Sequence, residues 1–220
     1  MRHDDRRVHE RLEQGLAELG LADRPRVHEV LMTLLALLHK WNRAYNLTAV
    51  RSRDDMVSRH LLDSAVVAPY LNGSTLLDVG SGPGLPGLVL AILAPERRVT
   101  LLDSNGKKVR FQRQAVMELG LTNVTPVQAR VEAFAGPAYG YDAVISRAFA
   151  SLGDFVSLST RLVADGGRWL AMKGPTVEDE LSGLPEDVTQ VASHELRVPF
   201  EAGQRRLVIL ERTASTQGRH

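Results

Sequence analysis

The segment with the clearest chemical potential is DVGSGPGLPG, in which an acidic residue is followed by closely spaced glycines. Asp78 ends a short apolar run, and Gly80, Gly82 and Gly84 come directly after it. Glycines accept positive φ angles and let a ligand approach the backbone closely. A helix expected after the loop would point its N-terminus at the same place, which favours a phosphate or a carboxylate. The glycines exceed what a simple turn needs, so this segment predicts a ligand-binding loop.

Two kinds of ligand suit this loop. Gly82 to Gly87 matches the G-x-G-x-x-G of dinucleotide-binding folds, and Asp103 follows about 20 residues later, where its carboxylate can accept from ribose hydroxyls. An acidic residue before G-x-G-x-G instead resembles the first motif of class I S-adenosylmethionine methyltransferases. Asp103 would serve either cofactor. No tyrosine is followed by lysine four residues later, as a short-chain dehydrogenase would require.

Two further segments follow strands of the predicted sheet. Val131 and Glu132 can provide an apolar wall and an acceptor for an adenine amino group, or they can simply begin a helix whose dipole favours the glutamate. Arg147 lies at the mouth of a buried strand and needs an anionic partner. That partner is Asp142 or Asp154 in a structural interpretation. In a functional interpretation the partner of Arg147 is a cofactor carboxylate or an RNA phosphate, since both match the planar fork of a guanidinium group.

Missing residue types narrow the chemistry. There are no cysteines, which excludes a cysteine nucleophile, a zinc ribbon and an iron–sulfur cluster. The seven histidines form neither H-x-x-x-H nor H-E-x-x-H, so no metal site is predicted. The SRAF string at 146–149 lacks the Asn/Asp-Pro-Pro-Tyr that is typical of adenine amino-group methylation. If a base accepts the methyl group, a ring nitrogen that is already nucleophilic is the simplest target.

Basic residues are concentrated in one stretch of a protein whose net charge is only +1. Residues 97–113 contain six Lys or Arg against one acidic residue. A local cationic face suits contact with phosphates, and a solvated helix surface is the alternative explanation. His60 precedes LLDS, and it either points toward a cleft or is a structural histidine of a helix.

Periodicity predicts the elements that position these residues. Apolar residues at helical spacing mark the first 71 residues, and short apolar runs then alternate with helical segments. This alternation is typical of a parallel sheet covered on both faces. Two late runs are too close together for a helical crossover, so they pair antiparallel. Helices are expected at 27–45, 56–71, 85–94, 105–119, 153–162 and 178–184, and strands at 75–80, 98–103, 123–129, 141–146, 168–173, 188–198 and 205–211.

The expected fold class is α/β: a Rossmann-like seven-stranded, mostly parallel sheet with a C-terminal antiparallel strand pair, preceded by an N-terminal helical extension. We divide the chain into that extension (1–72), a core (73–212) and a flexible tail (213–220). The charged N-terminus lacks the apolar segment of a signal peptide. The longest apolar runs are shorter than the roughly 20 residues of a membrane span. We therefore expect a cytoplasmic protein with no membrane partner.

Several strings, taken together, resemble one known family. WNRAYNLTAV, HLLDS, LLDVGSGPGLPG, LLDSNGKKVRF, VQARVE, ISRAF and AMKG follow in order from residue 41 onward. The combination is similar to the bacterial ribosomal RNA small subunit methyltransferase G family, also called glucose-inhibited division protein B. The resemblance implies S-adenosylmethionine as a consumed methyl donor, no metal, and methylation of guanine N7 in 16S ribosomal RNA.

The resemblance also implies roles for individual residues. Contacts to the donor would come from the glycine loop including Leu85, from Asp103, from Val131 and Glu132, and from Arg147. On the substrate side it implies His60, Arg147 and Lys173 as candidate catalytic residues. The partner would be small-subunit ribosomal RNA, naked or in an assembled particle, bound by a monomer.

Two other functions stay open at this point. One is a methyltransferase that acts on a small molecule or a protein, which would methylate no RNA. The other is a nicotinamide-dependent oxidoreductase, which would bind a different cofactor. The expected antiparallel pair of late strands favours a methyltransferase.

Overall fold

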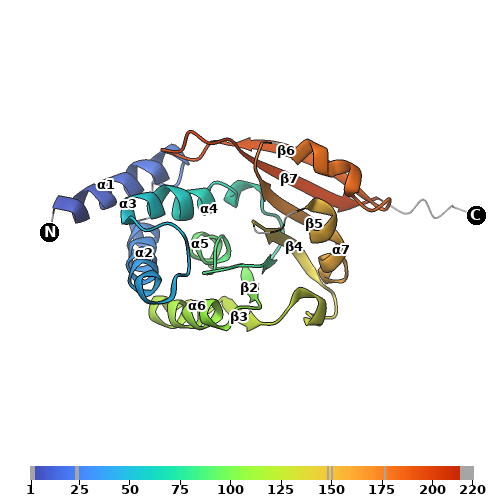
Figure 1. Cartoon of the computed structure of the whole chain (residues 1–220), viewed down its shortest axis with the longest axis horizontal. Helices are drawn as coiled ribbons and strands as arrows, with labels where there is room; N and C mark the ends of the chain where they lie inside the picture. Colours follow the sequence, from blue (N-terminus) through green and yellow to red (C-terminus); the bar gives the residue numbers. More distant parts are fainter. Residues whose placement is uncertain (1–2, 23–24, 148, 150, 176, 214–220) are drawn as a thin grey trace, which may run out of the picture.

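The computed structural model describes residues 3–22, 25–147, 149, 151–175 and 177–213. Seven strands form one sheet in the order β3-β2-β1-β4-β5-β7-β6 (Figure 1). Neighbouring strands are parallel except that β7 runs antiparallel to both β5 and β6, which confirms the predicted sheet. The strands are β1 (Thr75–Val79), β2 (Arg98–Asp103), β3 (Val124–Gln128), β4 (Tyr141–Ser146), β5 (Val163–Lys173), β6 (Val188–Leu196) and β7 (Arg205–Arg212).

Strand β1 lies where the order of the sheet reverses. It pairs with β2 on one side and with β4 on the other, so the loops after β1 and β4 leave the sheet from adjacent positions. In open α/β sheets ligands bind at this point, beyond the carboxyl ends of the strands. The strand is buried on both sides, because Leu76 packs into one hydrophobic cluster and Leu77 and Val79 into another.

Helices cover both faces of the sheet (Figure 1). The N-terminal helices, α5 and α6 share one hydrophobic cluster with one face, and α7 shares the second cluster with the other. Trp41 and Phe111 join α2 to α6, with ring centroids 5.7 Å apart. The predicted end of α6 is confirmed, since Gly120 takes a left-handed conformation there. The helices are α1 (His3–Glu18), α2 (Pro25–Tyr45), α5 (Gly87–Leu93), α6 (Gly106–Leu119) and α7 (Leu152–Ser159).

The N-terminal extension is less regular than the sequence predicts. The helix predicted over 56–71 is confirmed for most of its length, but it begins at Arg53 and its hydrogen bonding changes along the chain. It runs without a break through α3 (Arg53–Met56), a π-helical turn (Val57–Leu62) and α4 (Asp63–Ala65), and a 3-10 turn (Ala68–Tyr70) follows. π-helical turns are frequent at functional sites. Arg7 and Arg11 hold α1 over this segment by pairing with Asp54. Because the extension and the sheet share one core, the boundary at residue 72 stays a prediction.

Other boundaries also differ from the prediction. Strand β5 begins five residues earlier than expected, because Val163 already pairs with Tyr141 of β4. The helix expected at 178–184 is a 3-10 turn (Val177–Gly183), and the one at 153–162 ends in another (Thr160–Leu162). Residues 214–220 of the expected tail lie outside the described residues. In the described part of the chain, no helix is long and apolar enough to cross a membrane.

Asp142 fastens the amino end of β4 to that of β1. Its Oδ2 accepts hydrogen bonds from the backbone and hydroxyl groups of Ser74 and Thr75. Burial acts to raise the pKa of Asp142, but these hydrogen bonds outweigh it and hold the pKa below the usual value. The ionised side chain therefore stabilises the fold at the edge of the sheet opposite the glycine loop.

We expect Asp142→Ala to lower the free energy of unfolding by about 1–3 kcal/mol at pH 7, because it leaves the amides of Ser74 and Thr75 without their acceptor. A depressed pKa in the folded state gives stability that is present above the unfolded value and lost as pH falls through the folded one. The difference from the wild type should therefore shrink below a pH of about 4. Urea unfolding at several pH values measures this, with exposed Asp165→Ala as the matched control.

Candidate active site

The glycine loop after β1 is supported by side chains from other elements. Gly80, Gly82 and Gly84 have φ angles of 67°, 58° and 88°. Gln112 of α6 is fully buried, and its Nε2 donates to Ser81 Oγ at 2.9 Å and to the Gly82 carbonyl at 2.7 Å. A Cβ atom at Gly82 would meet no heavy atom of the described chain within 4 Å. The loop therefore needs glycine there for its backbone conformation, and the open side remains available to a ligand.

Asp78 lies at the base of the loop and is fully buried. Its Oδ2 accepts from the Gly87 amide at 2.8 Å. Gly87 has no room for a side chain, since a Cβ atom would lie 2.3 Å from Leu101 Cδ2. Burial raises the pKa of Asp78 to about 7. Its Oδ1 has no hydrogen-bond partner among the described residues, so the site contains a buried acceptor that a ligand can satisfy.

Asp103 ends β2 and closes the other side of the loop. Its Oδ2 accepts from the Gly82 amide and its Oδ1 from the Asn105 amide, both at 2.8 Å. The residue is nevertheless 9% exposed and lines a hollow of about 200 Å³. A carboxylate oxygen can accept more than one hydrogen bond, so Asp103 can position the loop and contact a ligand at once.

The same hollow is lined by Gly80 and by the pair Val131 and Glu132, which follows β3. Phe149 also lines it, and its ring lies 5.4 Å from that of Phe155. The structure thus brings together donor-site candidates from the ends of β1, β2 and β3. We name this space the donor hollow. Leu85 differs from them, because its side chain is buried in the core on the helix side of the loop.

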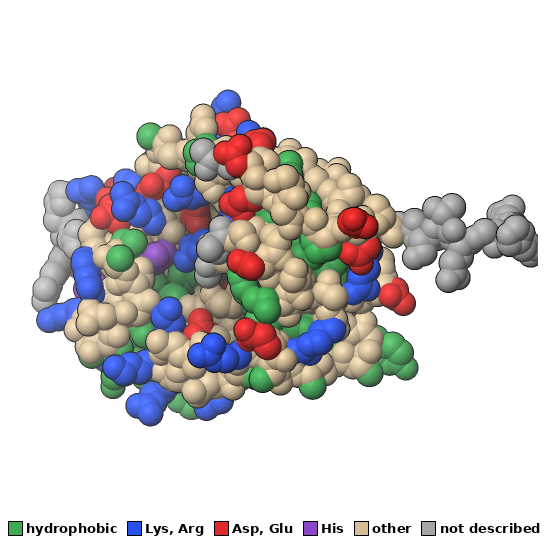
Figure 2. Space-filling view, turned by 45° about the vertical axis from the view of Figure 1, so that its right-hand side comes forward, with side chains coloured by type: hydrophobic (Ala, Val, Ile, Leu, Met, Phe, Trp, Pro, Cys, Tyr) green, Lys and Arg blue, Asp and Glu red, His purple; other side chains and the backbone are tan. Residues whose placement is uncertain are grey.

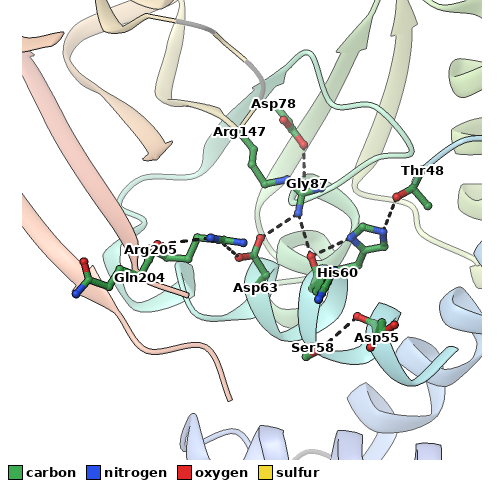
Figure 3. Close-up of polar contacts among 11 residues, drawn as sticks. Thr48, Asp55, Ser58, His60, Asp63, Asp78, Gly87, Arg147, Gln204 and Arg205 are labelled. Carbon is green, nitrogen blue, oxygen red and sulfur yellow. Dashed lines mark hydrogen bonds and ion pairs between the residues drawn. The ribbon is translucent and has the colours of Figure 1, made fainter. Parts of the chain in front are cut away.

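Arg147, at the end of β4, pairs with a carboxylate that the sequence interpretation missed. Its Nη1 donates to Asp63 Oδ2 at 3.0 Å, and Arg205 Nε donates to Asp63 Oδ1 at 3.2 Å (Figure 3). Asp63 is only 3% exposed. The structural interpretation named Asp142 or Asp154 as the partner, and the structure shows Asp63 in their place. Asp142 lies at the other end of β4 and binds Ser74 and Thr75.

His60 lies in the π-helical turn with both ring nitrogens engaged (Figure 3). Nδ1 is 2.9 Å from the Arg59 carbonyl, which can only accept, so Nδ1 carries the hydrogen. Nε2 then accepts from Thr48 Oγ1 at 2.9 Å. Burial, followed by the charge of Arg147, lowers the pKa of His60 to about 4. The ring is therefore neutral at pH 7, and its position is fixed from both sides.

Lys173, at the end of β5, is almost buried and forms several polar contacts. Its Nζ donates to the Phe149 carbonyl at 3.0 Å and pairs with Glu180 Oε2 at 2.8 Å. Glu180 in turn accepts from the Leu152 amide at 2.7 Å. Lys173 thus joins the segment after β4 to the turn after β5.

The three catalytic candidates lie around a second space. His60, Arg147 and Lys173 all line a hollow of about 370 Å³, together with Arg59 and Arg205. Figure 2 shows Lys and Arg side chains, in blue, gathered on the left half of the visible face. We name this space the cationic hollow. It lies beside β4, β5 and β7, whereas the donor hollow lies beside β1, β2 and β3, so the two flank the switch point of the sheet.

The basic residues at 97–113 lie at both ends of β2 and along α6. Arg97 lies at the amino end of β2, where its Nε donates to the Gly73 carbonyl at 3.2 Å. Lys107 and Lys108 lie in the first turn of α6, beyond the carboxyl end of the same strand. The strand thus separates residues that are close in sequence, and a phosphate-binding role for the Lys and Arg residues of α6 stays a prediction.

The sequence interpretation missed Asp63, Gln112 and Arg205. The sequence could have indicated a role for Gln112, since it is a polar residue on the apolar side of α6, next to Phe111. The sequence gives no such indication for Asp63 and Arg205, because their contact joins residues that are 142 positions apart. Ala148 of the SRAF string lies outside the described residues.

The strand order, the glycine loop after the first strand and the carboxylate after the second define a Rossmann-like, class I S-adenosylmethionine-dependent methyltransferase. The profile of the family described as rRNA small subunit methyltransferase G matches residues 27–209. The chain belongs to this family. Its membership removes the nicotinamide-dependent oxidoreductase from the alternatives.

Similar curated proteins cover almost the whole chain. The protein named Ribosomal RNA small subunit methyltransferase G from Chromohalobacter salexigens is 62% identical over 202 residues, which is 92% of this chain and 96% of that one. The protein of the same name from Aeromonas hydrophila is 49% identical over 96% of this chain and 98% of its own length.

Solved structures with low sequence identity show the same fold. TrmN from Thermus thermophilus matches with a TM-score of 0.54 and 19% identity, over 71% of this chain and 53% of that one. A SAM dependent methyltransferase from Aquifex aeolicus matches with a TM-score of 0.52 and 17% identity, over 68% of this chain and 90% of that one. At such identities the likeness concerns the fold alone.

We expect the His60 ring to remain neutral down to a pH of about 4. Because the pKa of His60 is lower in the folded protein, the folded protein binds fewer protons than the unfolded one. The contribution of neutral His60 to the free energy of unfolding is therefore complete above a pH of about 6.5 and is lost as pH falls toward 4. The loss relative to a His60→Gln variant should be about 3 kcal/mol. Urea unfolding of both proteins between pH 7 and pH 4 measures the difference.

The comparison with the variant is needed because Asp78, whose pKa is raised to about 7, changes stability in the opposite direction over the same range. Both proteins contain Asp78, so its contribution cancels in the difference. NMR titration of the His60 ring is the direct check. A midpoint near the ordinary value of about 6.5 would contradict the described burial and contacts.

Proposed function

We propose that this protein transfers a methyl group from S-adenosylmethionine to N7 of a guanine in small-subunit ribosomal RNA. The observation that carries the proposal is the pair of hollows on either side of the strand switch point. One is lined by carboxylates and apolar residues that suit a nucleoside, and the other by cations that suit an RNA. The names of the related proteins supply the substrate, small-subunit ribosomal RNA.

The donor hollow and the glycine loop beside it have four features that suit the methyl donor. The open side of Gly82 leaves room for close approach, and Asp103 can accept from ribose hydroxyls. Val131 and Glu132 would flank the adenine, with Glu132 accepting from its amino group. The unsatisfied Oδ1 of Asp78 offers an acceptor at the base of the loop. Direct contacts from Leu85 and Arg147 remain proposals.

Guanine N7 suits the residues of the cationic hollow because it needs no base. Its lone pair lies in the ring plane outside the aromatic system, so N7 is nucleophilic without losing a proton. As the new N–C bond forms, the S–C bond breaks, its electrons stay on sulfur, and the purine gains the positive charge. Orientation of the two reactants can contribute about 7–11 kcal/mol. His60 is a structural residue in this proposal, since Thr48 already donates to its Nε2.

Arg147 and Lys173 have positioning roles in the proposed reaction. Lys173 fixes the segment after β4 through the Phe149 carbonyl, and Asp63 holds the charge of Arg147 in the lining of the cationic hollow. The monomeric state, the cytoplasmic location and the choice between naked RNA and an assembled particle remain predictions. A small molecule or protein as methyl acceptor is the alternative that an RNA assay tests.

Removal of the adenine acceptor should weaken donor binding. We expect Glu132→Ala to lower the affinity for S-adenosylmethionine about fivefold, the value of one hydrogen bond of about 1 kcal/mol. Isothermal titration calorimetry measures the affinity, and Glu186→Ala, another exposed glutamate, is the control. S-adenosylmethionine should also raise the melting temperature of the wild type, as a ligand of the native state does. A shift with NADH instead would refute the assignment of the donor.

The methylated nucleoside should be 7-methylguanosine. With S-adenosylmethionine saturating, the transfer rate should vary little from pH 6 to pH 9, because titration of Asp78 in the donor loop then alters donor affinity and not this rate. A general base would contribute roughly 10²–10⁴-fold and would titrate, whereas N7 requires none. His60→Gln should therefore leave single-turnover transfer within about threefold of the wild type, far from that loss. Mass spectrometry of nucleosides from treated ribosomal RNA identifies the product. Methylation at an amino group, or a tenfold rise in rate near pH 6.5 that the variant abolishes, would contradict the proposal.

A further inference from the structure

We propose that the cationic hollow binds a phosphodiester of the RNA through Arg59 and Arg205, and that Glu201 occupies part of this site as a competing internal anion. The inference rests on the proposed function, because it takes RNA as the methyl acceptor. It adds two binding residues and one competing residue to the site, and all three lie outside the glycine loop: Arg59 in the π-helical turn, Glu201 between β6 and β7, and Arg205 at the start of β7.

The charges of the hollow are unbalanced. Among the described residues that line it, Asp63 is the one acid, whereas Arg59, Arg147, Lys173 and Arg205 are cations. Glu180, which does not line the hollow, offsets Lys173 at 2.8 Å. Asp63 is shared between Arg147 and Arg205, so one carboxylate faces two guanidinium groups. Partly buried cations in excess create a site that favours an added anion.

The two arginines that share Asp63 face different parts of the site. In Figure 3, Arg147 lies on the side of Asp63 toward Asp78 and Gly87, and Arg205 approaches Asp63 from the side of Gln204. A donor carboxylate near the glycine loop would therefore meet Arg147. An anion that enters from the side of β7 would meet Arg205.

Arg205 retains capacity for an anion. Its Nε binds Asp63 at 3.2 Å, while its Nη1 reaches the Gln204 carbonyl only at 3.5 Å. A guanidinium has five N–H donors in a planar fork that matches phosphate oxygens. The side chain is 41% exposed, so the fork is accessible while Asp63 fixes its base.

Arg59 contacts an anion that can be replaced. Its Nε lies 3.5 Å from Glu201 Oε1, and the same oxygen accepts from Ser58 Oγ at 2.6 Å. Glu201 belongs to the connection between β6 and β7, four residues before Arg205. The Arg59 side chain is 55% exposed. A phosphodiester carries the same charge and comparable acceptor oxygens, so it can take over the contact with Arg59 when RNA binds.

The test measures RNA affinity and its salt dependence for Arg59→Gln, Arg205→Gln and Glu201→Gln. Each arginine variant should weaken binding of small-subunit ribosomal RNA about tenfold at low salt, as loss of one charge-assisted hydrogen bond does. The slope of log K against log salt should fall by about 0.7–0.9 for each contact removed. Glu201→Gln should bind RNA more tightly, because it keeps the Ser58 contact and removes the competing charge.

Three comparisons complete the experiment. The gain from Glu201→Gln should disappear in a background that also carries Arg59→Gln. Arg205→Lys should restore most of the salt slope, which separates loss of charge from loss of the fold around Asp63. Arg98→Gln removes an exposed arginine at the amino end of β2 and should leave RNA affinity unchanged. The affinity for S-adenosylmethionine should be the same in all of these proteins.

One outcome would overturn the inference alone. In it, Arg59→Gln and Arg205→Gln still methylate ribosomal RNA, and both keep the RNA affinity and the salt slope of the wild type. If the two arginine variants bind S-adenosylmethionine more weakly but bind RNA as the wild type does, the inference is overturned as well, since the cationic hollow would then hold the donor carboxylate. A wild-type protein that methylates no ribosomal RNA would overturn the proposed function, and the inference with it.

Discussion

The carboxylate of Asp63 is the contact on which the arrangement of the site depends. Burying a charge costs several kcal/mol unless hydrogen bonds and opposite charges offset it. Arg147 and Arg205 provide that compensation, each to a different oxygen. Asp63 belongs to the N-terminal extension, Arg147 to the end of β4 and Arg205 to the start of β7. One buried charge therefore fixes three distant segments, and the extension becomes part of the site rather than an appendage to it.

The glycine loop depends on similar support from outside itself. Glycines are flexible in the unfolded chain, so a loop rich in them loses much entropy when it is fixed. Gln112, Asp103 and Asp78 hold the loop through the groups of Ser81, Gly82 and Gly87. These side chains belong to α6, β2 and β1, which rigid packing holds in place. The shape of the donor hollow is thus set by the sheet and one helix.

The sequence alone predicts the features of the fold that depend on local patterns of residues. The alternation of strands and helices, the antiparallel β6–β7 pair and the end of α6 at Gly120 follow from periodicity and glycine chemistry, and the structure confirms them. The partner of Arg147 could not be predicted, because it lies 84 positions away in the chain. The basic residues at 97–113 illustrate the opposite case, because a strand places residues that are close in sequence at opposite ends of the sheet. The π-helical turn has no periodic signature that separates it from an α-helix.

The distribution of charge between the two hollows agrees with the chemistry of methyl transfer. Asp103 and Glu132 line the donor hollow with Arg130, whereas the lining of the cationic hollow is predominantly basic. A sulfonium donor is positive and an RNA is negative, so under the proposed assignment each hollow attracts its own ligand and disfavours the other. In the proposed reaction at N7, methylation reverses part of this preference, because the purine gains the charge that sulfur loses. The positive charge of the surrounding arginines then opposes retention of the methylated base, and the residues that attract the RNA backbone also favour release of the modified nucleotide.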